Sequence, residues 1–235
     1  MRRALAVCAC LGFVACAELG IDPAVVDELL RASGSDAKAL AGVREALRIG
    51  AERGVARTAR PGGFLENPVV RIALPPELRD IGKALRAVGF NGTVDEIETT
   101  MNRAAEQASG EAADLLVTAV RNLTIRDAQA IVDGPDDAAT RYFRASSEDA
   151  LRARFEPIVE VAMKRVGLYR AYDELRDRHQ LLSLFGDPTV DLNRYVTDQT
   201  LEGLFTVLSE EEQRIRTDPA ARTTELLRDV FGGIL

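Results

Sequence analysis

The chain has 235 residues, of which 46% are hydrophobic and 29% charged, and its formal net charge is −7. This length is sufficient for one sizeable domain, since about 70% of the unfolded surface can be buried at this size. The acidic charge argues against nucleic acid as a partner, because nucleic acid attracts surfaces rich in lysine and arginine. Aromatic residues make up only 5% of the chain and tryptophan is absent, so the composition favours helix over sheet.

Residues 1–15 are predicted to form an export signal peptide. Arg2 and Arg3 precede an uncharged run from Ala4 to Ala15, which has the length of a signal-peptide core and is too short to span a bilayer. The run ends in Phe13-Val14-Ala15-Cys16, which resembles a bacterial lipobox. We therefore expect cleavage before Cys16 and attachment of a palmitate-bearing lipid to its thiol. An accidental start rich in alanine and cysteine is the alternative.

All three cysteines, Cys8, Cys10 and Cys16, lie within the first 16 residues, so the mature domain carries no thiol beyond the lipidated one. A disulfide framework and a zinc site of the His/Cys type are therefore excluded for that domain. We expect no cofactor and no metal. Residues 16–35 are predicted to be a lipidated tether that holds the protein on the periplasmic side of the outer membrane.

Residues 36–235 are predicted to form a single all-α domain of roughly ten short helices. A short helix begins at Asp22-Pro23, and Ser33-Gly34-Ser35 is expected to separate it from a second helix between Asp36 and about Val55. The segments Val69–Leu74 and Val190–Val196 alternate weakly, and they could pair as a small two-stranded β-ribbon.

Four further helix starts are predicted from capping residues. Thr93-x-x-Glu96 and Thr124-x-x-Asp127 have the spacing of capping boxes. Ser146 is expected to start a long helix, and Thr197 is expected to cap a strongly amphipathic one.

Several stretches of the chain are similar to the bacterial family called domain of unknown function 4197. The resemblance implies a helical domain behind an export signal and supplies no catalytic residues. It is carried by Glu45-Ala-Leu-Arg-Ile-Gly, Gly63-Phe-Leu-Glu-Asn-Pro, Ile72-Ala-Leu-Pro, Asn102-Arg-Ala-Ala-Glu, the long segment from Ile125 to Phe143, Arg154-Phe-Glu-Pro-Ile, Tyr195-Val-Thr-Asp and Asp218-Pro-Ala-Ala-Arg-Thr.

The sharpest local feature is the carboxylate cluster after Asp133-Gly-Pro. One interpretation is a ligand site in which Asp136 and Asp137 act together with Arg141 and Tyr142. The alternative is structural, with the two aspartates capping the next helix and complementing its dipole. A calcium loop spreads its ligands over about twelve residues, so the cluster does not match that pattern.

Catalytic signals are weak. The single histidine, His179, lies beside an apolar stripe, and the sequence has no Gly-x-Ser-x-Gly motif that would supply a nucleophilic serine for it to activate. The leading hypothesis is therefore a non-enzymatic envelope lipoprotein that binds a lipid or another amphipathic ligand between its helices. The alternatives are a helical protein-interaction or scaffold module with an envelope protein partner, and a cell-wall hydrolase that uses carboxylates. Its candidate carboxylates are Glu98, Glu106, Glu156 and Glu160.

Overall fold

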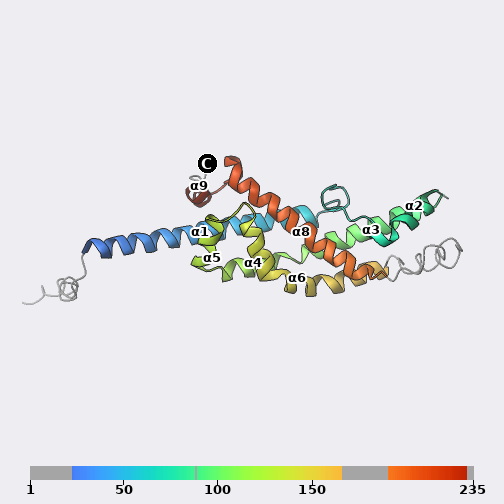
Figure 1. Cartoon of the computed structure of the whole chain (residues 1–235), viewed down its shortest axis with the longest axis horizontal. Helices are drawn as coiled ribbons and strands as arrows, with labels where there is room; N and C mark the ends of the chain where they lie inside the picture. The colour runs from blue at the N-terminus through green and yellow to red at the C-terminus, as the bar shows by residue number, and fades with distance from the viewer. Residues whose placement is uncertain (1–22, 88, 166–189, 232–235) are drawn as a thin grey trace, which may run out of the picture.

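The computed structural model describes residues 23–87, 89–165 and 190–231, and this part of the chain is all-α and elongated (Figure 1). The three long helices are α1 (Pro23–Ala59), α6 (Ala138–Arg165) and α8 (Leu192–Thr217). The shorter ones are α2 (Arg79–Ala87), α3 (Asn91–Gly110), α4 (Ala113–Asn122), α5 (Ile125–Val132) and α9 (Glu225–Phe231), and single 3₁₀ turns occupy Pro76–Leu78 and Pro219–Ala221.

Helix α8 lies at the centre of the packing and contacts α6, α1 and α3, while α4, α5 and α9 pack against α1. The first turns of α1 project beyond the other helices (Figure 1). The core is a single cluster of apolar side chains, and its largest fully buried members include Phe64, Phe155, Phe205 and Met101. No helix in the described ranges is both long enough and apolar enough to cross a membrane.

The predicted break at Ser33-Gly34-Ser35 is wrong, because α1 runs without interruption from Pro23 to Ala59. A glycine inside a helix costs about 1 kcal/mol relative to alanine, which is a small penalty once the helix is nucleated. The buried stretch around Val43, Leu47 and Ala51 holds α1 against the core, and the turns ahead of it only have to extend an existing helix.

The predicted β-ribbon is also wrong. Val69–Leu74 consists of turns and irregular backbone, and Leu192–Val196 forms the first turns of α8. The two segments nevertheless meet, since the Tyr195 hydroxyl donates a hydrogen bond to the carbonyl oxygen of Ala73 over 3.1 Å. The backbone pairing that a strand would have given Ile72 is supplied by the side chain of Asn102 instead.

Three of the four predicted helix starts are displaced. Helix α3 begins at Asn91 rather than after Thr93, and no side chain caps it. Helix α6 begins eight residues before Ser146, at Ala138. Helix α8 begins at Leu192, where the Asp191 side chain accepts a hydrogen bond from the N–H of Arg194.

The capping box at Thr124 is confirmed. The Thr124 hydroxyl accepts a hydrogen bond from the N–H of Asp127, whose carboxylate accepts one from the N–H of Thr124. Thr124 and Asp127 are only three residues apart, so this motif needs no tertiary contact to form.

Candidate functional site

The four predicted ligand residues do not converge on one point. Asp137 and Arg141 form an ion pair at 2.9 Å one helical turn apart, while Asp136 is exposed. Tyr142 lies on another face of α6, and its hydroxyl donates a hydrogen bond to the carbonyl oxygen of Ala119 in α4 over 2.8 Å. Burial, followed by the nearby Asp127 carboxylate, raises the pKa of Tyr142. A common ligand for these four residues stays a prediction.

The first turn of α6 is capped from another helix. The carboxylate of Glu212 in α8 accepts hydrogen bonds from the N–H groups of Ala139 at 2.9 Å and Thr140 at 2.8 Å. The guanidinium of Arg216 binds the same carboxylate at 2.9 Å, and it also donates to the carbonyl oxygen of Ile131 in the last turn of α5. This buried pair therefore joins the end of α5, the start of α6 and the body of α8.

Two residues of α3 hold the irregular segment between α1 and α2. The Asn102 amide donates to the carbonyl oxygen of Ile72 and accepts from its N–H, at 2.7 and 2.8 Å. The Glu106 carboxylate accepts hydrogen bonds from the N–H groups of Phe64 and Leu65, both at 3.2 Å. The motif Asn102-Arg-Ala-Ala-Glu106 thus binds Gly63-Phe-Leu-Glu-Asn-Pro and Ile72-Ala-Leu-Pro, and this accounts for three of the stretches that carry the resemblance.

A fourth stretch, Asp218-Pro-Ala-Ala-Arg-Thr, closes the C-terminal end of α8. The buried guanidinium of Arg222 donates hydrogen bonds to the carbonyl oxygens of Ile215 and Arg216, at 3.0 and 2.6 Å. The Asp218 side chain accepts a hydrogen bond from the N–H of Ala220 and so caps the following 3₁₀ turn. This motif too has a structural role.

The apolar cavity between α1, α5, α6 and α8 is small. Its volume is about 30 Å³, and it is lined by Gly50, Phe143, Leu208 and Ile215 among others. A volume of that order holds about one water molecule, whereas a site for a small ligand needs several hundred Å³. The lipid-binding hypothesis draws no support from this cavity and stays a prediction.

The outer surface carries larger hollows, and two of them lie along the contact between α6 and α8, which we call the α6–α8 seam. One hollow of about 370 Å³ has Asp137, Arg141, Arg144 and Glu202 among its lining residues. The other, of about 750 Å³, is lined by Arg152, Glu156, Glu160, Asp191, Asn193, Arg194 and Asp198.

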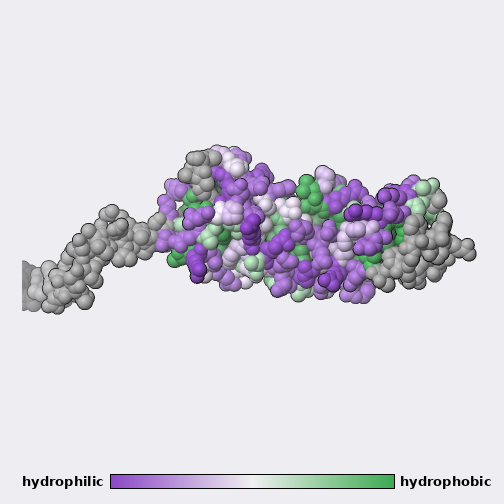
Figure 2. Space-filling model, viewed as in Figure 1, coloured by the Kyte–Doolittle hydropathy of each residue, from purple (hydrophilic) through white to green (hydrophobic). Residues whose placement is uncertain are grey.

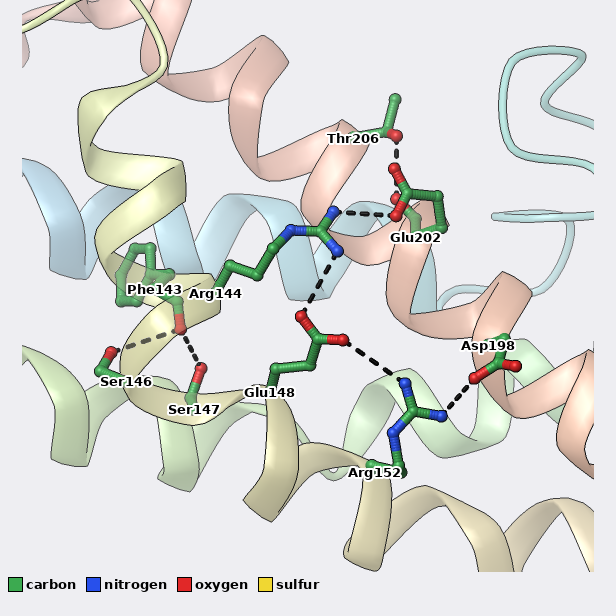
Figure 3. A network of polar contacts seen from close by, with 9 residues as sticks. All are labelled: Phe143, Arg144, Ser146, Ser147, Glu148, Arg152, Asp198, Glu202 and Thr206. Atoms are coloured by element: carbon green, nitrogen blue, oxygen red, sulfur yellow. Dashed lines mark hydrogen bonds and ion pairs between the residues drawn. The ribbon is translucent and has the colours of Figure 1, made fainter.

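A chain of ion pairs connects the two hollows of the seam (Figure 3). Arg144 contacts Glu202 on α8 at 2.9 Å and Glu148 on its own helix at 3.4 Å. Arg152 continues the series by pairing with Glu148 and with Asp198 of α8. The Arg144 guanidinium also lies 4.4 Å from the ring centre of Phe205, which is buried below it. The seam is therefore a polar surface built by two antiparallel helices.

A third hollow, of about 410 Å³, lies between α3 and α6. Six of its seven lining residues come from one face of α3, and the seventh is Ala162 of α6. The six are Glu96, Thr99, Thr100, Arg103, Ala104 and Gln107.

The four proposed hydrolase carboxylates do not all lie in one place, although two of them line the same hollow. Glu98 pairs with Arg71 at 3.1 Å, and Glu106 binds loop N–H groups. Glu156 and Glu160 lie in the larger seam hollow, where Glu160 also pairs with Lys164. Within the described ranges, no group of three or more His, Cys, Asp or Glu side chains is arranged to hold a metal ion.

The lipidation residue Cys16 and His179 lie outside the described residues, so the predictions about them stand as they were made. The structural residues that the sequence did not single out are Glu212, Asn102 and Arg222. Glu212 had a detectable signal, because it follows Leu208 by four positions and precedes Ile215 by three. That spacing places a carboxylate on the apolar stripe of its helix.

In the described part of the chain, the fold and its surface define an all-helical domain with a small apolar cavity inside and polar hollows on the outside. The chain belongs to the family described as "Protein of unknown function (DUF4197)", whose family model matches residues 33–232. The suspected family is thereby confirmed. No curated protein and no solved structure matches the chain.

Proposed function

We propose that this chain is a non-enzymatic interaction module of the bacterial cell envelope, which binds a partner protein along the α6–α8 seam. The observation that carries the proposal is the contrast in volume between the small apolar cavity and the two hollows of the seam. The apolar cavity has room for about one water molecule, while the two seam hollows measure about 370 and 750 Å³.

The charge of the seam indicates what kind of partner it favours. Seven carboxylates and four arginines line its two hollows. A basic surface on the partner would complement this acidic excess, and such complementarity increases association rates and specificity more than raw affinity. The ion pairs between Arg144, Glu148 and Arg152 link side chains along the seam, and side chains that already have a partner lose less freedom on binding.

The rest of the surface supports the same interpretation. The visible face of the molecule is mostly hydrophilic, and hydrophobic residues appear there only in small separate patches (Figure 2). The exposed large apolar side chains of the described residues belong to different elements, namely Val69, Phe90, Ile125 and Val161. Large apolar patches mark the interfaces of permanent complexes, so a polar and reversible contact fits this surface better.

The test is site-specific photo-crosslinking in living cells. A photoreactive amino acid is introduced at Thr206 or Asn193, which line the two seam hollows, and at exposed Asp114 of α4 as the matched control. We expect both seam positions to give the same discrete adduct and the control position to give none. In vitro, raising the salt concentration should weaken the contact with the identified partner. Equal labelling from all three positions, or no adduct from the seam, would contradict the proposal.

We further propose that the domain is attached to the periplasmic side of the outer membrane by a lipid on Cys16. The support is the leader with its lipobox-like end and the absence of any other cysteine after residue 15. Metabolic labelling with radioactive palmitate should mark the wild-type protein and leave the Cys16→Ala variant unlabelled. Equal label in both proteins would refute the anchor without affecting the interaction proposal.

A further inference from the structure

We propose that the hollow between α3 and α6 is a second binding site, which takes a short peptide with a free amino terminus and a free carboxylate. This inference does not depend on the seam or on its partner. It rests on the two charged side chains that line the hollow and on the spacing of the two residues along α3.

Arg103 differs from the arginines of the other hollows. Those of the seam are all paired with carboxylates: Arg141 with Asp137, Arg144 with Glu202, and both Arg152 and Arg194 with Asp198. Arg103, in contrast, makes no hydrogen bond and no ion pair with any described residue, although it lines a hollow of about 410 Å³. A guanidinium presents a planar fork of donors that matches a carboxylate, so this end of the hollow fits a peptide's C-terminal group.

Glu96 supplies the opposite charge at the other end. Its carboxylate also has no partner among the described side chains, and only its backbone carbonyl is used, by the Thr100 hydroxyl. Glu96 and Arg103 are seven residues apart on one face of α3, a rise of about 10 Å along the helix axis. An extended tripeptide has about this length, at roughly 3.3–3.6 Å per residue. The two charges therefore match the two ends of such a ligand.

The middle of the hollow fits the backbone of the same ligand. Its lining includes Ala104, which is buried, and Ala162 of α6, so small apolar side chains can pack against it. Thr99 and Gln107 also line the hollow and carry a hydroxyl and an amide that make no hydrogen bond with any described residue. Both groups can donate and accept, as the N–H and C=O groups of a peptide require.

The experiment is an amide NMR titration of the purified chain with tri-alanine as the probe. We expect chemical-shift changes confined to α3 between Glu96 and Gln107 and to the neighbourhood of Ala162. N-acetylated tri-alanine and tri-alanine amide, each with one charge removed, should bind about five- to tenfold more weakly, as expected for the loss of one charge-assisted contact at a surface.

Two variants separate this site from nonspecific attraction. Arg103→Gln should weaken tri-alanine about five- to tenfold and abolish the preference for a free carboxylate, and Glu96→Gln should abolish the preference for a free amine. The matched control is Arg121→Gln, which removes an exposed arginine that lies on α4 and outside the hollow. The inference is overturned if blocked and free peptides bind alike, if the shifts map elsewhere, or if Arg121→Gln weakens binding as much as Arg103→Gln.

Discussion

The carboxylate of Glu212 in α8 accepts hydrogen bonds from both the N–H and the hydroxyl of Thr140 at the start of α6, each over 2.8 Å. Residues 72 positions apart therefore make the N-terminal cap that is usually supplied by the residue just before a helix. The negative charge lies where the helix dipole favours it. Arg216, one turn further along α8, compensates that charge within the protein interior.

Glu212→Gln is expected to lower the free energy of unfolding by about 3 kcal/mol. The reason is that Arg216, whose side chain is only 6% exposed, loses the carboxylate that neutralises it. Urea denaturation followed by circular dichroism measures the change. Glu210→Gln is the control, because Glu210 pairs with Arg57 at a half-exposed position, and its loss should cost less than about 1 kcal/mol. Equal effects of the two substitutions would contradict the interhelical role of Glu212.

Asn102→Ala is expected to destabilise the protein by about 2–3 kcal/mol. It leaves the N–H and C=O of Ile72 without partners in a position where the residue is 1% exposed. Limited proteolysis should also show faster cleavage between Gly63 and Ile72, since this segment loses one of its attachments to α3. The control is Asn122→Ala at the exposed end of α4, which should change stability by less than about 0.5 kcal/mol. A loss of stability without faster cleavage would show that Asn102 does not fix this segment.

The capping box at Thr124 predicts a pH dependence. Hydrogen bonds from the Thr124 hydroxyl and N–H lower the pKa of Asp127 below its usual 3.8. A carboxyl group whose pKa is lower in the folded state than in the unfolded state stabilises the protein at pH values above its unfolded-state pKa. This contribution is lost as the pH falls through the folded-state pKa. Asp127→Asn should therefore cost about 1 kcal/mol at pH 6, and the difference from the wild type should shrink as the pH falls below about 4.

Denaturant midpoints measured between pH 6 and pH 3 test this dependence. In a Thr124→Ala background, the effect of Asp127→Asn should be smaller and should vary less with pH, because the hydroxyl, one of the two donors that lower the Asp127 pKa, is gone while the backbone N–H remains. A difference that stays constant over the whole range would show that Asp127 acts without titrating.

The features that sequence reasoning predicted correctly are local or compositional. The all-α class follows from helical periodicity, and the Thr124 box follows from two residues three positions apart. The same local rule failed at Thr93, where the box residues fall inside α3. The expectation of a helix break at Ser33-Gly34-Ser35 failed as well, because the packing of the later part of α1 outweighs a weak local preference.

The contacts that fix the architecture could not be predicted from the sequence. Glu212 and Thr140, Asn102 and Ile72, and Tyr195 and Ala73 are each joined across 30 residues or more. No local pattern states which helix end a distant carboxylate will cap. The candidate site could not be predicted from local sequence either. Asp137 and Arg141 pair with each other, and the hollows depend on how α6 packs against α8 and α3.

Two glycines in the middle of long helices are predicted to respond in opposite ways to the same substitution. A Cβ at Gly50 of α1 would lie 3.9 Å from Ile215, at ordinary contact distance, and would enter the small apolar cavity. Gly50→Ala should therefore raise the free energy of unfolding by about 0.5–1 kcal/mol through helix propensity, with a further gain from the filled space.

Gly203→Ala in α8 carries the same gain in helix propensity but meets a filled core. Its Cβ would lie 2.5 Å from the ring of Phe64, which is fully buried, and 3.3 Å from Cβ of Val70. A close-packed interior cannot move the ring without displacing its neighbours, so we expect a net loss of about 1–3 kcal/mol. Thermal and urea denaturation of the two variants, measured side by side, give the comparison. A stabilising Gly203→Ala would show that the segment around Phe64 is not held against α8 as tightly as the contacts indicate.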